Sequence, residues 1–144
     1  MGFPDRIERT LQLSQSPERV WQALTTAEGL GTWFGNSAEV DLRVGGTAKL
    51  SWTSGDSATL TIERLDEPRV FGYTWHIYGL PAEDPRRTYV EFTLAPSGGG
   101  TTLTVVESGF AQLPDEQHKV SFGGNTTGWT SELGELVDYL DGKS

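Results

Sequence analysis

The chain has 144 residues, of which 35% are hydrophobic and 22% charged, and it carries a formal net charge of −9. These values are typical of one globular domain over residues 1–144 with a real core, and they exclude a disordered chain. The negative charge argues against nucleic acid and anionic membranes as general partners, because phosphate groups would be repelled. The absence of cysteine excludes disulfides and thiolate chemistry. With no signal peptide and no apolar run of membrane-spanning length, we expect a cytoplasmic protein.

The first third of the chain predicts a strand followed by two short helices. Alternating apolar residues over 6–14 favour a half-buried strand. Ser16 is a good N-cap for the next segment, Pro17 suits the first helical position, and the segment 16–24 therefore predicts a helix. Thr26 can cap a second, shorter helical turn over 27–34.

The middle of the chain, from residue 39 to 108, predicts β-structure throughout. Alternation of apolar and polar residues is clearest at 58–65, where Leu60 and Ile62 share one face. Short Gly-, Asp- and Pro-containing turns separate the segments, so an antiparallel meander of six strands is the simplest topology. The predicted strands are 38–44, 47–52, 58–65, 70–78, 88–94 and 101–108.

The end of the chain predicts a long helix. Pro114 and the acidic residues after it are typical of a helix start, and Gly142 of a helix end. Apolar residues recur at helical spacing, which predicts a buried stripe; they are Trp129, Leu133, Leu136, Val137 and Leu140. We expect Gly123 and Gly124 to loosen or break the approach to this stripe, Asn125 or Thr126 to cap it, and Gly128 to allow close packing. The fold class is therefore α+β, in the order β-α-α-β6-α.

Residues 123–130 have the glycine spacing of a phosphate-binding loop, but Trp129 stands where that loop needs lysine. The preceding segment is charged and helical in character instead of a buried strand. We therefore reject a nucleotide-binding site.

Few residues in this sequence are suited to catalysis. His76 and His118 lack metal-ligand spacing, and no hydrolase motif is present, so we expect satisfied or surface histidines, no metal and no cofactor. Glu107 shares strand parity with Leu103 and Val105, which directs it inward. A carboxylate there would need a partner or a raised pKa, and could anchor a ligand or act as a base. The interpretation that we favour is that Glu107 reaches water at the strand end.

The residues predicted to face inward are unusually aromatic. We favour an ordinary core position for Phe71, Phe92 and Leu136, because buried aromatic and leucine side chains are common there. For Trp33, Phe34 and Trp129 core and pocket remain equal alternatives, since these residues lie beside glycines at element ends. The indole N–H groups of Trp33 and Trp129 could orient a polar group on a flat apolar ligand. The candidate pocket residues are Trp33, Phe34, Trp52, Leu60, Tyr73, Trp75, Phe92, Glu107, Phe110, Trp129 and Leu133.

Five motifs in this order carry a resemblance to a known family. They are a Pro-x-x-Val-Trp helix at 17–21, a Trp-Phe pair at 33–34, a strand ending in Trp75, a last strand running into Ser-Gly-Phe at 108–110, and a closing Gly-Trp helix from 128. Together they resemble the Hsp90-ATPase-activator-homologue family of the START-like (Bet v 1-like, SRPBCC) superfamily, over residues 6–141. The segment before the Trp-Phe pair, Ala-Glu-Gly-Leu-Gly, departs from the family, which often has Asp-Pro there.

The resemblance implies a helix-grip fold, in which a curved antiparallel sheet wraps around the long C-terminal helix and encloses a cavity. It suggests three functions: a non-catalytic module that binds a small hydrophobic or aromatic ligand, a chaperone-associated or stress-response interaction domain, or a cyclase- or hydrolase-like enzyme that uses Glu107 or His76. We favour the first. The expected partners are a small hydrophobic ligand, or a chaperone or other protein, for a monomer or homodimer that binds neither nucleic acid nor membrane.

Overall fold

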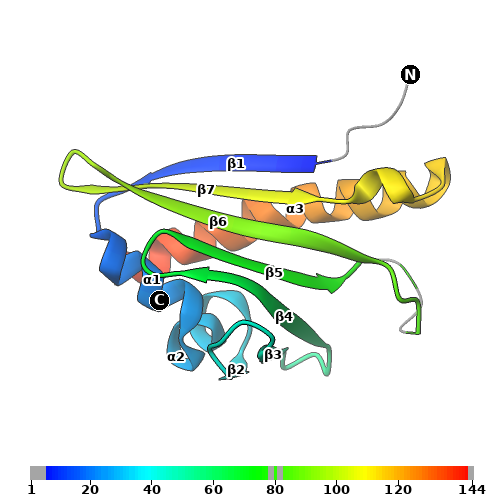
Figure 1. The fold of residues 1–144 in the computed structure, drawn as a ribbon, viewed down its shortest axis with the longest axis horizontal. Coiled ribbons are helices and arrows are strands. Elements are labelled where there is room, and N and C mark those ends of the chain that lie inside the picture. Colours follow the sequence, from blue (N-terminus) through cyan, green and yellow to red (C-terminus); the bar gives the residue numbers. More distant parts are fainter. Residues whose placement is uncertain (1–5, 78–79, 81–82, 143–144) are drawn as a thin grey trace.

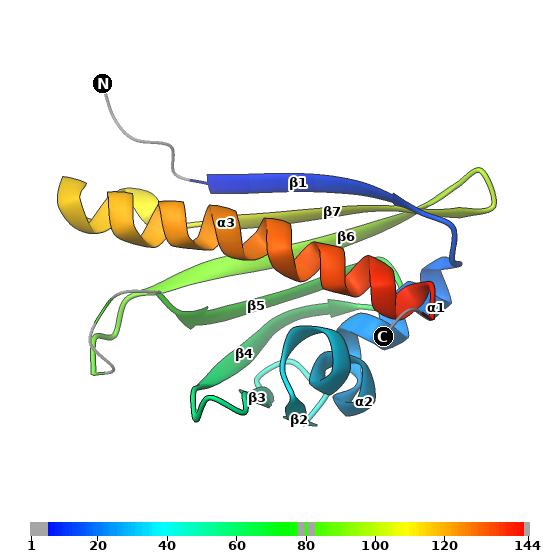
Figure 2. The same ribbon diagram turned by 180° about the vertical axis from the view of Figure 1, so that it is seen from behind.

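A seven-stranded antiparallel sheet forms one layer of the protein, and a long C-terminal helix lies across one of its faces (Figures 1 and 2). The computed structural model describes residues 6–77, 80 and 83–142, apart from the side chains of Ala111, Asp115, Gln117, His118 and Lys119. The predicted end of one strand at Tyr78 and the side chain of His118 therefore lie outside the described part. The α+β prediction is confirmed.

The sheet has the strand order β1-β7-β6-β5-β4-β3-β2, and every neighbouring pair is antiparallel. Only β1 is displaced from chain order, because it pairs with the last strand. The strands are β1 (Arg6–Leu13), β2 (Ser37–Val40), β3 (Thr47–Ser51), β4 (Ser57–Asp66), β5 (Val70–His76), β6 (Arg87–Ser97) and β7 (Gly100–Ser108).

Two short helices and a single π-helical turn connect β1 to β2: α1 (Pro17–Thr25), α2 (Ala27–Gly29) and η1 (Leu30–Phe34). Both predicted caps are present, since Ser16 accepts from the Arg19 N–H and Thr26 from the Gly29 N–H. Gly29 has no room for a side chain, because a Cβ there would lie 2.6 Å from the carbonyl oxygen of Ala23. These contacts fix the direction in which η1 presents Trp33 and Phe34.

The prediction of a strand over 38–44 is wrong beyond Val40. The chain leaves the sheet there and turns at Gly45, whose φ is +86°, a conformation that favours glycine. The Gly45 N–H then donates to the carbonyl of Ile62, and the Ile62 N–H to the carbonyl of Gly46. These bonds continue the pairing of β3 with β4, and residues 41–44 form the connection between β2 and β3.

A 3₁₀ turn, η2 (Phe110–Gln112), leads into α3 (Asp115–Leu140), which runs without a break. The prediction that Gly123 and Gly124 interrupt the helix, with Asn125 or Thr126 as a cap, is therefore wrong. Each helical glycine costs up to about 1 kcal/mol, but packing of an apolar face against the sheet can outweigh this cost. The buried stripe of α3 contains Trp129, Leu133, Leu136 and Leu140, while Val137 is half-buried.

Candidate functional site

A buried carboxylate, Glu107 on β7, lies at the centre of the hydrogen-bond network between the sheet and α3. Its side chain is 0% exposed, so the prediction that it reaches water is wrong. Oε1 accepts from Trp129 Nε1 at 2.8 Å and from Asn125 Nδ2 at 2.8 Å. Oε2 accepts from Trp75 Nε1 at 2.8 Å, from Asn125 Nδ2 at 2.9 Å and from the Thr88 hydroxyl. An ionised carboxylate, which only accepts, matches these donors.

This network joins four elements at one point. Trp75 comes from β5, Thr88 from β6, and both Asn125 and Trp129 from α3. Asn125 precedes Trp129 by four residues, so both side chains leave the same face of the helix. Glu107 therefore ties α3 to the sheet, and it fixes the rings of Trp75 and Trp129 through their only polar atoms.

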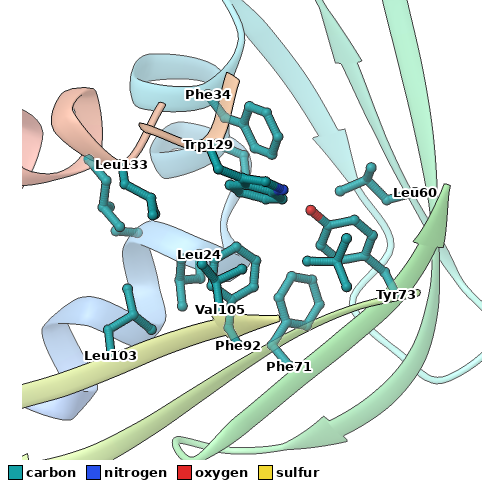
Figure 3. Close-up of a cluster of buried hydrophobic side chains, with 14 of the residues drawn as sticks. Leu24, Phe34, Leu60, Phe71, Tyr73, Phe92, Leu103, Val105, Trp129 and Leu133 are labelled. Carbon is teal, nitrogen blue, oxygen red and sulfur yellow. The ribbon is translucent and has the colours of Figure 1, made fainter. Parts of the chain in front are cut away.

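The aromatic side chains around the network pack in edge-to-face and tilted pairs. Phe34 is central: its ring centroid lies 6.3 Å from that of Trp52, 5.8 Å from Trp75 and 5.9 Å from Trp129. Trp129 also contacts Phe92 at 5.8 Å. Figure 3 shows Trp129 of α3 beside Phe34 and facing the sheet residue Tyr73. Separations of this size are typical of favourable aromatic pairs.

Two adjoining pockets open beside this cluster, between η1, the sheet and α3. The first, which we call the aromatic pocket, has a volume of about 240 Å³ and is lined by Phe34, Trp52, Trp75, Gly124, Asn125, Gly128, Trp129 and Glu132. The second, the acidic pocket, has a volume of about 370 Å³ and is lined by Thr32, Trp33, Phe34, Gly35, Asn36, Trp52, Glu132, Glu135, Asp138 and Tyr139. Both share Phe34, Trp52 and Glu132, and together they form one cleft.

Gly128 keeps the aromatic pocket open. A Cβ built at Gly128 would meet no atom within 4 Å, so the expected close packing at this glycine is not observed. The residue instead leaves space that a side chain would occupy.

Three carboxylates of α3 border the cleft. Glu132 lines both pockets, and its Oε2 is buried without a hydrogen-bond partner. Burial and the negative charge of neighbouring Glu135 raise the pKa of Glu132 to about 8. Asp138 lies one helical turn beyond Glu135 on the same pocket wall.

Comparisons with known proteins identify the family. Residues 14–141 match the family described as "Activator of Hsp90 ATPase homolog 1-like protein". The chain belongs to this family. No protein with a curated description matches it.

Solved structures similar to this family member share its fold. A protein from Mesorhizobium loti is 27% identical with a TM-score of 0.82, over 96% of this chain and 98% of that chain. The Aha1 dimer from Colwellia psychrerythraea is 24% identical with a TM-score of 0.79, over 96% and 98%. An HSP90 activator from Plasmodium falciparum is 21% identical with a TM-score of 0.77, over 96% and 97%. These similarities establish the START-like helix-grip fold. In the described part of the chain, no helix is both long and apolar enough to cross a membrane.

The structure brings five of the predicted pocket residues to the cleft: Trp33, Phe34, Trp52, Trp75 and Trp129. The other six are buried and line neither pocket: Leu60, Tyr73, Phe92, Glu107, Phe110 and Leu133.

Tyr73 has a buried hydroxyl without a hydrogen-bond partner. Burial and the nearby charge of Glu107 raise its pKa well above the usual value.

The polar groups of the site differ from those that the sequence predicts. The indole N–H groups do not face the pockets, because Trp75 and Trp129 donate to Glu107, Trp33 to the Ala23 carbonyl and Trp52 to the Phe34 carbonyl. His76, a weighed catalytic candidate, is half-buried, and its Nε2 lies 2.9 Å from the Leu80 carbonyl oxygen.

Sequence reasoning missed Thr88, Asn125 and Glu132 as site residues. For Asn125 and Glu132 a signal exists, because they lie four residues before and three after Trp129, on the same helix face. For Thr88 no local signal exists, since its partner Glu107 is 19 residues away on the next strand.

Proposed function

We propose that this protein is a cytoplasmic binding module that holds a small hydrophobic or aromatic molecule in the cleft and catalyses no reaction. The observation that carries the proposal is the aromatic pocket, in which four aromatic side chains surround a space of about 240 Å³ that continues into the acidic pocket of about 370 Å³. Ligand sites are concave, mainly apolar and largely preformed, and typically have volumes of roughly 300–1,000 Å³.

Preorganisation of the walls supports the proposal. Trp75 and Trp129 are fixed by Glu107, and Trp52 by its hydrogen bond of 3.0 Å to the Phe34 carbonyl. A ligand would enter between rings that are already ordered, which lowers the entropy lost on binding.

The position of Glu107 supports a role without catalysis. Four donors occupy its two oxygens, and it lines neither pocket. A general base must reach the proton that it removes. In this arrangement Glu107 positions the pocket walls, so we assign it a structural part in binding.

Two matched variants of α3 test the proposal. Gly128→Leu places a side chain in the aromatic pocket, whereas Gly134→Leu makes the same change at an exposed helix position outside both pockets. Neither Cβ meets an atom within 4 Å, so we expect both variants to fold. We expect the neutral probe naphthalen-2-ylmethanol, titrated by calorimetry, to bind the wild type and Gly134→Leu alike and Gly128→Leu at least about tenfold more weakly.

Equal affinities for all three proteins would place the probe outside the cleft, and absence of binding to the wild type would refute an aromatic ligand site. Native mass spectrometry of protein purified from its own cells adds an independent measurement. A retained small molecule that Gly128→Leu loses is the expected result.

A chaperone-associated role is the second candidate. The observation that favours it is a pair of exposed apolar side chains, Leu42 and Val44, in the loop between β2 and β3. The names of the family and of the Plasmodium neighbour refer to Hsp90 activation. If this role holds, the protein raises the ATPase rate of Hsp90, Val44→Glu weakens the effect, and Gly128→Leu does not.

A further inference from the structure

We propose that the ligand of the cleft is an organic cation, a flat aromatic body that carries a quaternary or protonated amine, with the cationic group among the aromatic rings and Glu132. This inference rests on the proposed function and names the ligand class of the same site. Two observations support the inference: which hydrogen-bonding groups of the pocket walls are free, and which charges surround them.

The donors of the aromatic pocket are already used. The indole N–H of Trp52 donates to a backbone carbonyl, and those of Trp75 and Trp129 donate to Glu107. The amide nitrogen of Asn125 donates to the same carboxylate at 2.8 and 2.9 Å. An anionic ligand would therefore find no free indole donor here. Four aromatic side chains line the pocket instead, and aromatic rings attract cations over their faces.

The groups that α3 offers to a ligand in the cleft are carboxyl groups. Glu132 stands where the two pockets meet, with Oε2 buried and unpaired. Among the described residues that line the two pockets, Glu132, Glu135 and Asp138 are acidic and none is basic. A cation bound against the rings would supply the opposite charge that Glu132 lacks.

The groups that face Glu132 make binding depend on pH. Glu135, Asp138 and Tyr139 approach along α3. The opposite wall comes from η1, the two residues that follow it and the residue that follows β3, and it contributes only uncharged residues: Thr32, Trp33, Phe34, Gly35, Asn36 and Trp52. With the pKa of Glu132 raised to about 8, this carboxyl group is largely protonated at neutral pH. A permanent cation prefers the ionised form, so its affinity should rise as the pH passes through that value.

Three probes with one aromatic body test the inference: (naphthalen-2-ylmethyl)trimethylammonium, neutral naphthalen-2-ylmethanol and naphthalen-2-ylacetate. The quaternary cation does not titrate, so any pH dependence of its affinity belongs to the protein. We expect the cation to bind at least about tenfold more tightly than the alcohol, and the anion to bind most weakly. We also expect the affinity for the cation, but not for the alcohol, to increase between about pH 6.5 and pH 9.

Glu132→Gln and Glu8→Gln provide the matched pair of variants. Both remove one negative charge, but Glu8 is exposed on β1, at the opposite edge of the sheet from β2 and β3. Glu132→Gln should remove the preference for the cation and its pH dependence while the alcohol still binds, and Glu8→Gln should change neither.

The outcomes separate the two proposals. If the alcohol binds in the cleft and the cation binds no more tightly, the inference is overturned and the proposed function stands. If no probe binds the wild type, both fail. A preference for the cation that survives in Glu132→Gln also overturns the inference, because general attraction to the acidic protein would then explain it.

Discussion

Replacing Glu107 by glutamine tests whether an ionised carboxylate holds α3 on the sheet. Each oxygen of Glu107 accepts from an indole N–H, Oε1 from Trp129 and Oε2 from Trp75, and these groups cannot accept in return. Whichever way the new amide turns, its NH₂ group faces one of them. The substitution preserves shape, so the change in stability reports on hydrogen bonding and charge.

The expected loss in the free energy of unfolding is about 2–3 kcal/mol. One buried donor loses its acceptor, at a cost of roughly 1–3 kcal/mol. The remaining bonds become neutral ones, which are about half as strong as those to a charged group. Part of this loss is offset because an amide is less costly to bury than a carboxylate.

Urea denaturation of the wild type, Glu107→Gln and the exposed control Glu8→Gln, followed by tryptophan fluorescence, measures the difference. We expect the control to change stability by at most about 0.5 kcal/mol, because surface ion pairs contribute little. If Glu107→Gln is as stable as the wild type, the argument from an ionised acceptor is refuted.

Three further substitutions have predicted effects on stability, each measurable by denaturation. Tyr73→Phe removes a buried hydroxyl without a partner and should stabilise by about 1 kcal/mol; a loss of stability would show that the hydroxyl is bonded. Gly128→Ala should stabilise by about 0.5–1 kcal/mol through helix propensity, and destabilisation would mean that the pocket space is filled. Because the folded-state pKa of Glu132 is raised to about 8, the wild type loses stability as the pH rises from the usual glutamate value through that point. Glu132→Gln should reduce this loss by about 1 kcal/mol after allowance for partial exposure, and an unchanged pH profile would contradict the shift.

Local signals predicted most of the elements. Ser16 and Thr26 cap helices as expected, because a cap depends only on the next three residues. The part of the predicted strand 38–44 beyond Val40 and the continuity of α3 were predicted incorrectly. In both places tertiary contacts decide: Gly45 and Gly46 bond to Ile62 of β4, which turns the chain into β3, and packing keeps α3 helical through its glycines.

The candidate site was partly predictable. Strand parity directed Glu107 inward, but its burial depends on Asn125 and Trp129, which lie 18 and 22 residues away in the sequence. The aromatic residues could be listed from the sequence. Which of their N–H groups remain free depends on partners that only the folded chain brings together, so the acceptor character of the cleft could not be predicted.

We propose the cleft between η1, the sheet and α3 as the ligand site. The most direct measurement is a ¹H–¹⁵N correlation spectrum of the tryptophan indoles during titration with naphthalen-2-ylmethanol. We expect the indole signals of Trp52, Trp75 and Trp129 to shift together, while that of Trp21, which lines neither pocket, does not. Saturable binding that leaves these three signals unchanged would contradict this proposal.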